Sequence, residues 1–126
     1  MKTLLLALLL FTGSACAEWI KVFKTAKGDC YFDPASIRSD DNRRSAWEIQ
    51  NLKQPGTDGE LSNRIRSEYD CKQGRYRFLS LSAHSEPMAG GKTLLQTSEE
   101  DTKDAKWRDI PPNSTVAIML KIVCAR

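Results

Sequence analysis

Hydrophobic and polar residues alternate most clearly between residues 64 and 83. In residues 64–71, the odd-numbered positions include Ile65, Tyr69 and Cys71, and the even-numbered positions are charged. This period of two is typical of a strand with one face on a core and one face in solvent. After a turn, residues 76–83 are predicted to form the partner strand.

The turn between these strands predicts their register. A two-residue loop at 73–74, with glycine second to supply positive φ, places Tyr69 opposite Phe78. It also places Asp70 opposite Arg77, so that an acid meets a base. A three-residue loop mixes the two faces, and we therefore favour the two-residue loop.

Shorter patterns predict the remaining elements. Further strands are expected at residues 19–25, 30–32, 46–50, 92–97 and 107–110. Loops are expected at residues 26–29, 38–44, 53–62, 84–91 and 98–106, the last with room for a helical turn. Asp33 as a cap, followed by Pro34, predicts a single helical turn at 33–36.

The final segment, residues 113–126, fits two periods. As a helix capped by Asn113 or Ser114, it gathers one apolar stripe. That stripe consists of Val116, Met119, Leu120, Val123 and Cys124. As a strand, it alternates Val116, Ile118, Leu120 and Ile122. Its β-branched content favours the strand, whereas its Pro-Pro-Asn-Ser start and its length favour the helix, so both interpretations stay open.

The first 17 residues have the pattern of a secretory signal peptide. Lys2 precedes a short apolar run at 4–11, and Ala15 and Ala17 predict cleavage before Glu18. The run is too short to span a bilayer, which needs about 20 residues. We therefore expect an exported domain at residues 18–126, periplasmic or secreted and without a transmembrane segment. The alternative is an outer-membrane lipoprotein anchored at Cys16.

Composition narrows the classes of partner. The chain has 126 residues with a net charge of +3, which disfavours a nucleic-acid binder. Cys30, Cys71 and Cys124 remain after the predicted cleavage, an odd number in an oxidising compartment. One disulfide and one free thiol are the simplest account. The oligomeric state is not predicted.

No catalytic motif is visible. His84 is the single histidine, which excludes a multi-histidine metal site, and its loop-like surroundings predict a solvated side chain. The chain has no nucleophile elbow, phosphate-binding loop or dinucleotide fingerprint. Nothing in the sequence brings Cys30 and His84 together as a dyad. We therefore expect no enzyme activity, cofactor or metal, although a deep apolar pocket with converging polar groups would favour a hydrolase.

Three arginines form a candidate basic patch. Arg64, Arg66 and Arg77 share the predicted solvent face and could attract an acidic polymer. Glu68 and Asp70 interrupt this patch. An ordinary mixed-charge sheet face is therefore the favoured interpretation.

A set of short motifs, in this order and spacing, resembles the surface-adhesin protein E-like family over nearly all of residues 18–126. They are Trp19, Tyr31-x-Asp33-Pro34-x-Ser36-Ile37, Trp47-Glu48, Asp70-Cys71, Arg75-Tyr76-Arg77, Pro87-Met88 with Gly91-Lys92, Trp107-x-x-Ile110-Pro111-Pro112-x-Ser114, and Cys124.

The resemblance implies an α+β fold. It consists of a single antiparallel β-sheet of about five to six strands, with a C-terminal α-helix packed on one face. A disulfide between Cys71 and Cys124 is implied to link helix and sheet, and both cysteines lie on predicted apolar faces. Cys30 falls outside the family pattern and is expected to be a buried free thiol. An intermolecular disulfide or a reactive thiol is the alternative.

The implied function is an exported non-enzymatic binding module of the bacterial envelope or extracellular space, resembling an adhesin. Its expected partner is a host protein, an envelope protein or an acidic polymer. The alternative function is a periplasmic housekeeping or stress protein that binds a small ligand or an envelope partner.

Overall fold

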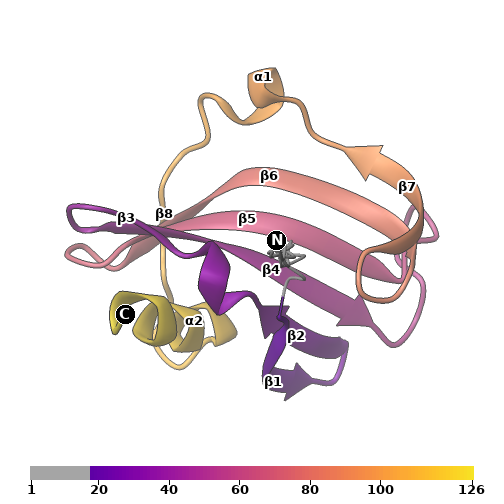
Figure 1. Ribbon diagram of the computed structural model, residues 1–126, viewed down its shortest axis with the longest axis horizontal. Helices are drawn as coiled ribbons and strands as arrows, with labels where there is room; N and C mark the ends of the chain where they lie inside the picture. Colours follow the sequence, from indigo (N-terminus) through magenta and orange to yellow (C-terminus); the bar gives the residue numbers. More distant parts are fainter. Residues whose placement is uncertain (1–17) are drawn as a thin grey trace, which may run out of the picture.

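The computed structural model describes residues 18–126, which form eight β-strands and three helical segments (Figure 1). The elements are β1 Ile20–Thr25, β2 Gly28–Phe32, η1 Pro34–Ser36, β3 Arg38–Asp40, β4 Arg43–Leu52, β5 Ser62–Asp70, β6 Arg75–Glu86, β7 Gly90–Gln96, α1 Glu99–Thr102, β8 Arg108–Asp109 and α2 Thr115–Cys124. No helix in this range is long and apolar enough to span a membrane. The predicted signal peptide, with Cys16, lies outside the described residues.

The strands form one antiparallel sheet in the order β1-β2-β4-β5-β6-β7. Two short strands join it at the sides, β3 beside β4 and β8 beside β6. The predicted α+β architecture is confirmed, but eight strands replace the expected five to six. The prediction of a loop at 38–44 was wrong because β3 and β4 form a tight hairpin there. Asp41 sits in that turn with a φ of 51°, a conformation that aspartate tolerates.

The β5–β6 register differs from the predicted register by two residues. Asp70 lies opposite Arg75 instead of Arg77, because four residues, 71–74, connect the strands. The prediction of a two-residue loop was therefore wrong. A shift of two residues leaves the side chains near the turn on their predicted faces, so Tyr69 still faces the core.

Asp70 explains the longer turn. Its Oδ1 accepts hydrogen bonds from the backbone N–H groups of Lys72 and Gln73, at 3.1 and 2.9 Å. The N–H of Gly74 donates to the carbonyl oxygen of Asp70 at 2.9 Å. Gly74 does adopt positive φ, at 63°, as expected for a glycine in this position.

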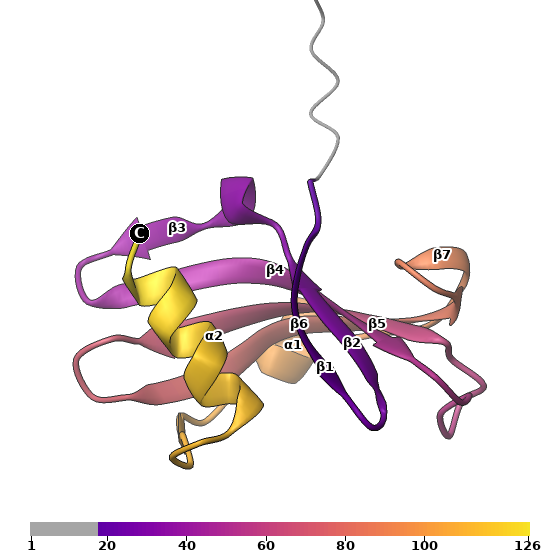
Figure 2. The ribbon, with the colours of Figure 1, turned by 90° about the horizontal axis from the view of Figure 1, so that it is seen from below.

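The final segment is a helix, which settles the two open interpretations. Ser114 is its N-cap, since the Ser114 Oγ accepts a hydrogen bond from the N–H of Ala117. The buried residues Met119 and Val123 of α2 pack on the sheet. Their partners in the core cluster are Phe32, Ala46 and Tyr69. Figure 2 shows α2 lying obliquely on the side of the sheet toward which the β1–β2 hairpin also curls.

The disulfide implied by the resemblance is confirmed. Cys71 and Cys124 are bonded, with their Cα atoms 5.8 Å apart. Cys71 opens the turn after β5, and Cys124 is the last residue of α2. The bond therefore fixes the end of the helix to the sheet.

Candidate functional site

The three predicted patch arginines share one face of the sheet, opposite α2. Since Tyr69 faces the helix, Arg64, Arg66 and Glu68 point to the other side. Arg77 lies opposite Glu68 on that same side. We call this surface the open face.

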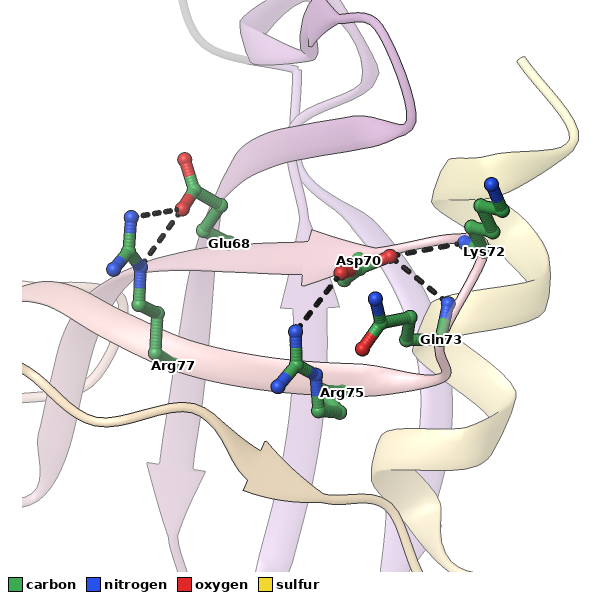
Figure 3. Close-up of polar contacts among 6 residues, drawn as sticks. All are labelled: Glu68, Asp70, Lys72, Gln73, Arg75 and Arg77. Carbon is green, nitrogen blue, oxygen red and sulfur yellow. Dashed lines mark hydrogen bonds and ion pairs between the residues drawn. The ribbon is translucent and has the colours of Figure 1, made fainter.

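Ion pairs neutralise part of the open face (Figure 3). Glu68 Oε1 accepts hydrogen bonds from Arg77 Nη2 and Nε, at 2.7 and 2.8 Å. Arg75 Nη2 lies 3.3 Å from Asp70 Oδ2. Backbone N–H donation from Gln73, with smaller contributions from Arg75 and Lys72, lowers the pKa of Asp70.

Two tryptophans stack with arginines on the open face. The Arg64 Cζ lies 3.8 Å from the centroid of the Trp47 ring. The Arg77 Cζ lies 4.3 Å from the centroid of Trp107, which precedes β8. Such contacts are worth about 0.5–2 kcal/mol, depending on solvent exposure. Neither Arg64 nor Arg66 forms an ion pair with a described residue, so these two carry the uncompensated charge.

A pocket of about 180 Å³ lies on the other side of the sheet, between the β-strands and the first turns of α2. We call it the Glu48 pocket. Its apolar lining residues include Phe23, Ile65, Phe78, Val116 and Met119. Its polar lining includes Cys30, Glu48, Ser67 and Tyr69.

Glu48 is the central polar group of this pocket. Its Oε1 accepts a short hydrogen bond from the hydroxyl of Tyr69, and its Oε2 accepts one from Ser67 Oγ at 2.9 Å. Burial raises the pKa of Glu48 to about 7, although both hydrogen bonds oppose this shift. Near neutral pH, Glu48 is therefore divided between its acidic and ionised forms.

Sequence reasoning missed Glu48. Residues 46–50 alternate as predicted, but the parity with Ala46 and Glu48 faces α2, and Trp47 takes the opposite face. The small side chain of Ala46 leaves room for the helix to approach the sheet. The available signals were the pairings of Glu48 with apolar Phe32 of β2 and apolar Ile65 of β5, which can be read only once the strand registers are known.

Cys30 lies in the same pocket, half-buried and unpaired within the described chain. Burial, followed by the negative charge of Glu48, raises the pKa of Cys30 to about 11. The thiol is therefore protonated at neutral pH, which opposes a nucleophilic role. Ser67 and Tyr69 direct their hydroxyl hydrogens to Glu48, so no activated nucleophile is visible in the pocket.

His84 is buried in β6, and the prediction of a solvated loop residue was wrong. Strand β6 continues through His84, which pairs with Ser62 of β5, to Glu86, which pairs with Gly90 of β7. His84 Nε2 lies 2.7 Å from Ser82 Oγ, and burial, with the nearby charge of Arg64, lowers the pKa of His84. The strand pairings align Cys30 with Ala83 across the sheet, so these two side chains point to the same face. His84 follows Ala83 and points to the opposite face, so Cys30 and His84 do not form a dyad.

Comparison with solved structures identifies the fold. The crystal form II structure of Haemophilus influenzae protein E is 18% identical, with a TM-score of 0.63, and the match covers 87% of this chain and 89% of that chain. The selenomethionine form of the same protein is 16% identical, with a TM-score of 0.64 and coverages of 87% and 88%. Protein E from non-typeable Haemophilus influenzae is 16% identical, with a TM-score of 0.60 and coverages of 90% and 79%. At these identities the likeness shows the fold.

No curated protein sequence matches the chain. The family model described as "Surface-adhesin protein E", however, matches residues 19–125. That match includes both disulfide cysteines, the open face and the Glu48 pocket. The chain therefore belongs to the Surface-adhesin protein E family.

Proposed function

We propose that this protein is an exported, non-enzymatic binding module of the bacterial envelope or extracellular space that acts as an adhesin toward a host or envelope protein. Family membership supports an adhesin-like surface protein. The signal-peptide pattern of residues 1–17 supports export.

The arginine–tryptophan stacks on the open face are the observation that carries this proposal. Trp and Arg are the residues most enriched at the energetic centres of protein interfaces. Here the guanidinium group of Arg64 stacks on Trp47, and that of Arg77 stacks on Trp107, on one surface. A stacked pair loses little conformational entropy when a partner binds. The open face is therefore the proposed contact surface.

The ion pairs indicate which partner this surface would fit. A uniform polyanion would meet Glu68 and Asp70 as well as the arginines, and repulsion would weaken its binding. A folded protein with both kinds of charge can complement such a mixed surface. We therefore favour a protein partner over an acidic polymer.

Two measurements test the proposal. Protease shaving of intact cells should remove the protein, whereas an intact protein in shaved cells would place it in the periplasm. Adherence of the same cells to a cultured host monolayer should fall about tenfold for Arg64→Ala, the scale of one interface hot spot. Lys121→Ala, which removes one charge from the exposed side of α2, is the matched control.

An immobilised sulfated polysaccharide tests the acidic-polymer alternative. If Arg64→Ala combined with Arg66→Ala clearly lowers the salt needed for elution, the polymer becomes the favoured partner. If elution is unchanged, the acidic-polymer alternative is eliminated.

A further inference from the structure

The Glu48 pocket has a polar floor and apolar walls. The carboxyl of Glu48 joins Ser67 of β5 and Tyr69 of β5 in one hydrogen-bonded group. The walls come from β1, β2, β4, β5, β6 and α2 and present mostly hydrocarbon and aromatic surface. A few convergent polar groups in an apolar pocket are typical of a small-molecule site.

The described structure supplies no positive charge to Glu48. The titratable side chains that line the pocket besides Glu48 are Cys30, Tyr31, Tyr69 and Tyr76, and none of them is cationic. Strand β1 and helix α2 contribute only uncharged side chains, Phe23, Thr115, Val116 and Met119. An ionised carboxylate without a counter-charge is costly away from water.

The carboxyl group of Glu48 can also accept further hydrogen bonds. Each carboxylate oxygen can accept about two hydrogen bonds, and Oε1 and Oε2 of Glu48 each accept one from the protein. A bound donor could therefore be accommodated without breaking the bonds from Ser67 and Tyr69. Since two hydroxyls already fix the carboxyl group, little rotamer entropy would be lost on binding.

The size of the pocket limits the ligand. A volume of about 180 Å³ is well below the roughly 300–1,000 Å³ of sites for drug-sized molecules. It is close to the apolar cavity of about 150 Å³ that accommodates benzene. The pocket therefore fits one ring or one short branched chain.

From these observations we propose that the Glu48 pocket binds a small apolar amine, with the ammonium group on the Glu48 carboxylate and the hydrocarbon part between Ile65, Phe78 and Val116. This site is independent of the open face, because the two lie on opposite sides of the sheet. It adds a small-molecule site to a protein proposed to bind macromolecules.

Protonation gives the site a characteristic pH dependence. The amine is charged below about pH 10, the range of a lysine-like ammonium, and the pKa of Glu48 is about 7. The ammonium–carboxylate pair therefore exists mainly between these values. Affinity should fall about 25-fold from pH 7.5 to pH 5.5, in proportion to the ionised fraction of Glu48.

The test uses the protein as the cells produce it and three probes of similar shape. These probes are 2-phenylethylamine, the neutral 2-phenylethanol and the anionic 3-phenylpropionate. Titration followed by amide NMR gives both the affinity and the location of binding. The proposal expects 2-phenylethylamine to bind most tightly, to shift the amides of Ile65 and Val116, and to bind about 25-fold more weakly at pH 5.5 than at pH 7.5.

Variants separate charge from shape. Glu48→Gln keeps the size and one acceptor but removes the charge, and it should weaken 2-phenylethylamine at least tenfold while leaving 2-phenylethanol unchanged. Glu86→Gln makes the same change at an exposed site and should have no effect. Val116→Phe, which fills the pocket, should abolish binding of every probe.

Four results would overturn the proposal. They are equal binding of amine and alcohol with no pH dependence, preferred binding of 3-phenylpropionate, amide shifts outside the pocket, and no binding at millimolar concentrations of any probe. The comparison of probes on the unaltered chain decides the outcome even if Glu48→Gln fails to fold. The adherence assay tests the open face and does not depend on binding in the Glu48 pocket. Failure of this proposal can therefore be distinguished from failure of the proposed function.

Discussion

Arg77 lies directly across the β5–β6 ladder from Glu68, and two of its guanidinium nitrogens lie 2.7 and 2.8 Å from one carboxylate oxygen. The side chains are only 24% and 16% exposed. Arg77 is therefore a partner of Glu68 and Trp107 more than a free cation. The positive charge of the open face is concentrated at Arg64 and Arg66.

Loss of Arg77 should destabilise the fold. Arg77→Met keeps part of the apolar stem but leaves Glu68 unpaired, and we expect unfolding to become easier by roughly 1–3 kcal/mol, between the values for exposed and buried pairs. Urea denaturation at pH 7 measures this change. The double variant with Glu68→Gln should recover part of the loss, and no recovery would show that the ion pair is not the cause.

Removal of the disulfide should cost more. The bond between Cys71 and Cys124 spans 53 residues, for which the chain-entropy estimate is about 4 kcal/mol. Cys71→Ser with Cys124→Ser should therefore lower the urea midpoint strongly, with amide hydrogen exchange rising first in α2. Cys30→Ser is the control and should leave the helix protected. Equal protection of α2 with and without the bond would contradict the expectation.

Stability should depend on Glu48 between pH 4.5 and pH 7. Its pKa is about 7 in the folded protein against an ordinary value of 4.5, so the folded state holds this proton more tightly. The stabilisation is complete below pH 4.5 and is lost as pH rises through 7, by on the order of 3 kcal/mol. Denaturation of the protein and of Glu48→Gln across this range isolates the contribution, because Asp70, Asp101 and His84 titrate in both. The variant should gain stability relative to the parent as pH increases, and a constant difference would argue against a raised pKa.

Cys30 should react slowly with alkylating reagents. A pKa of about 11, against 9.0 for an ordinary thiol, implies about 100-fold less thiolate at pH 8. Mass spectrometry of iodoacetamide labelling, with the urea-unfolded chain as reference, measures the ratio of rates. Glu48→Gln should increase the rate in the folded protein because it removes a neighbouring negative charge. Equal rates in folded and unfolded chains would contradict the assignment.

Local patterns predicted much of the fold. Asp33 does cap the turn that begins at Pro34, with its Oδ1 accepting from the N–H of Ala35 at 3.0 Å. Ser114, one of the two expected caps, is the N-cap of α2, although the local pattern had left helix and strand open for that segment. Each of these caps is formed with a residue fewer than four positions away, so the local sequence is enough to predict it. The β5–β6 register was missed because the bonds from Asp70 to its own turn compete with the glycine-based loop.

The candidate sites were less accessible to prediction. The alternation of β4 gives its two faces but not which of them meets α2, so Glu48 resembled a solvent residue. The pKa of Glu48 and that of Cys30 depend on strands that lie far apart in the sequence. The disulfide came from family resemblance, since three cysteines alone leave the pairing open.

The position of the disulfide has a mechanical consequence for α2. Cys124 is the last residue of the helix, whereas Thr115 and Val116, in its first turn, line the Glu48 pocket. Over ten residues, a rise of about 1.5 Å each separates these ends by roughly 14 Å. The disulfide thus holds one end of the helix, whereas the other end is held by packing, by the Ser114 cap and by the chain that leads back to β8. A small tilt about the sulfur atoms would widen or narrow the pocket while the covalent anchor stays intact.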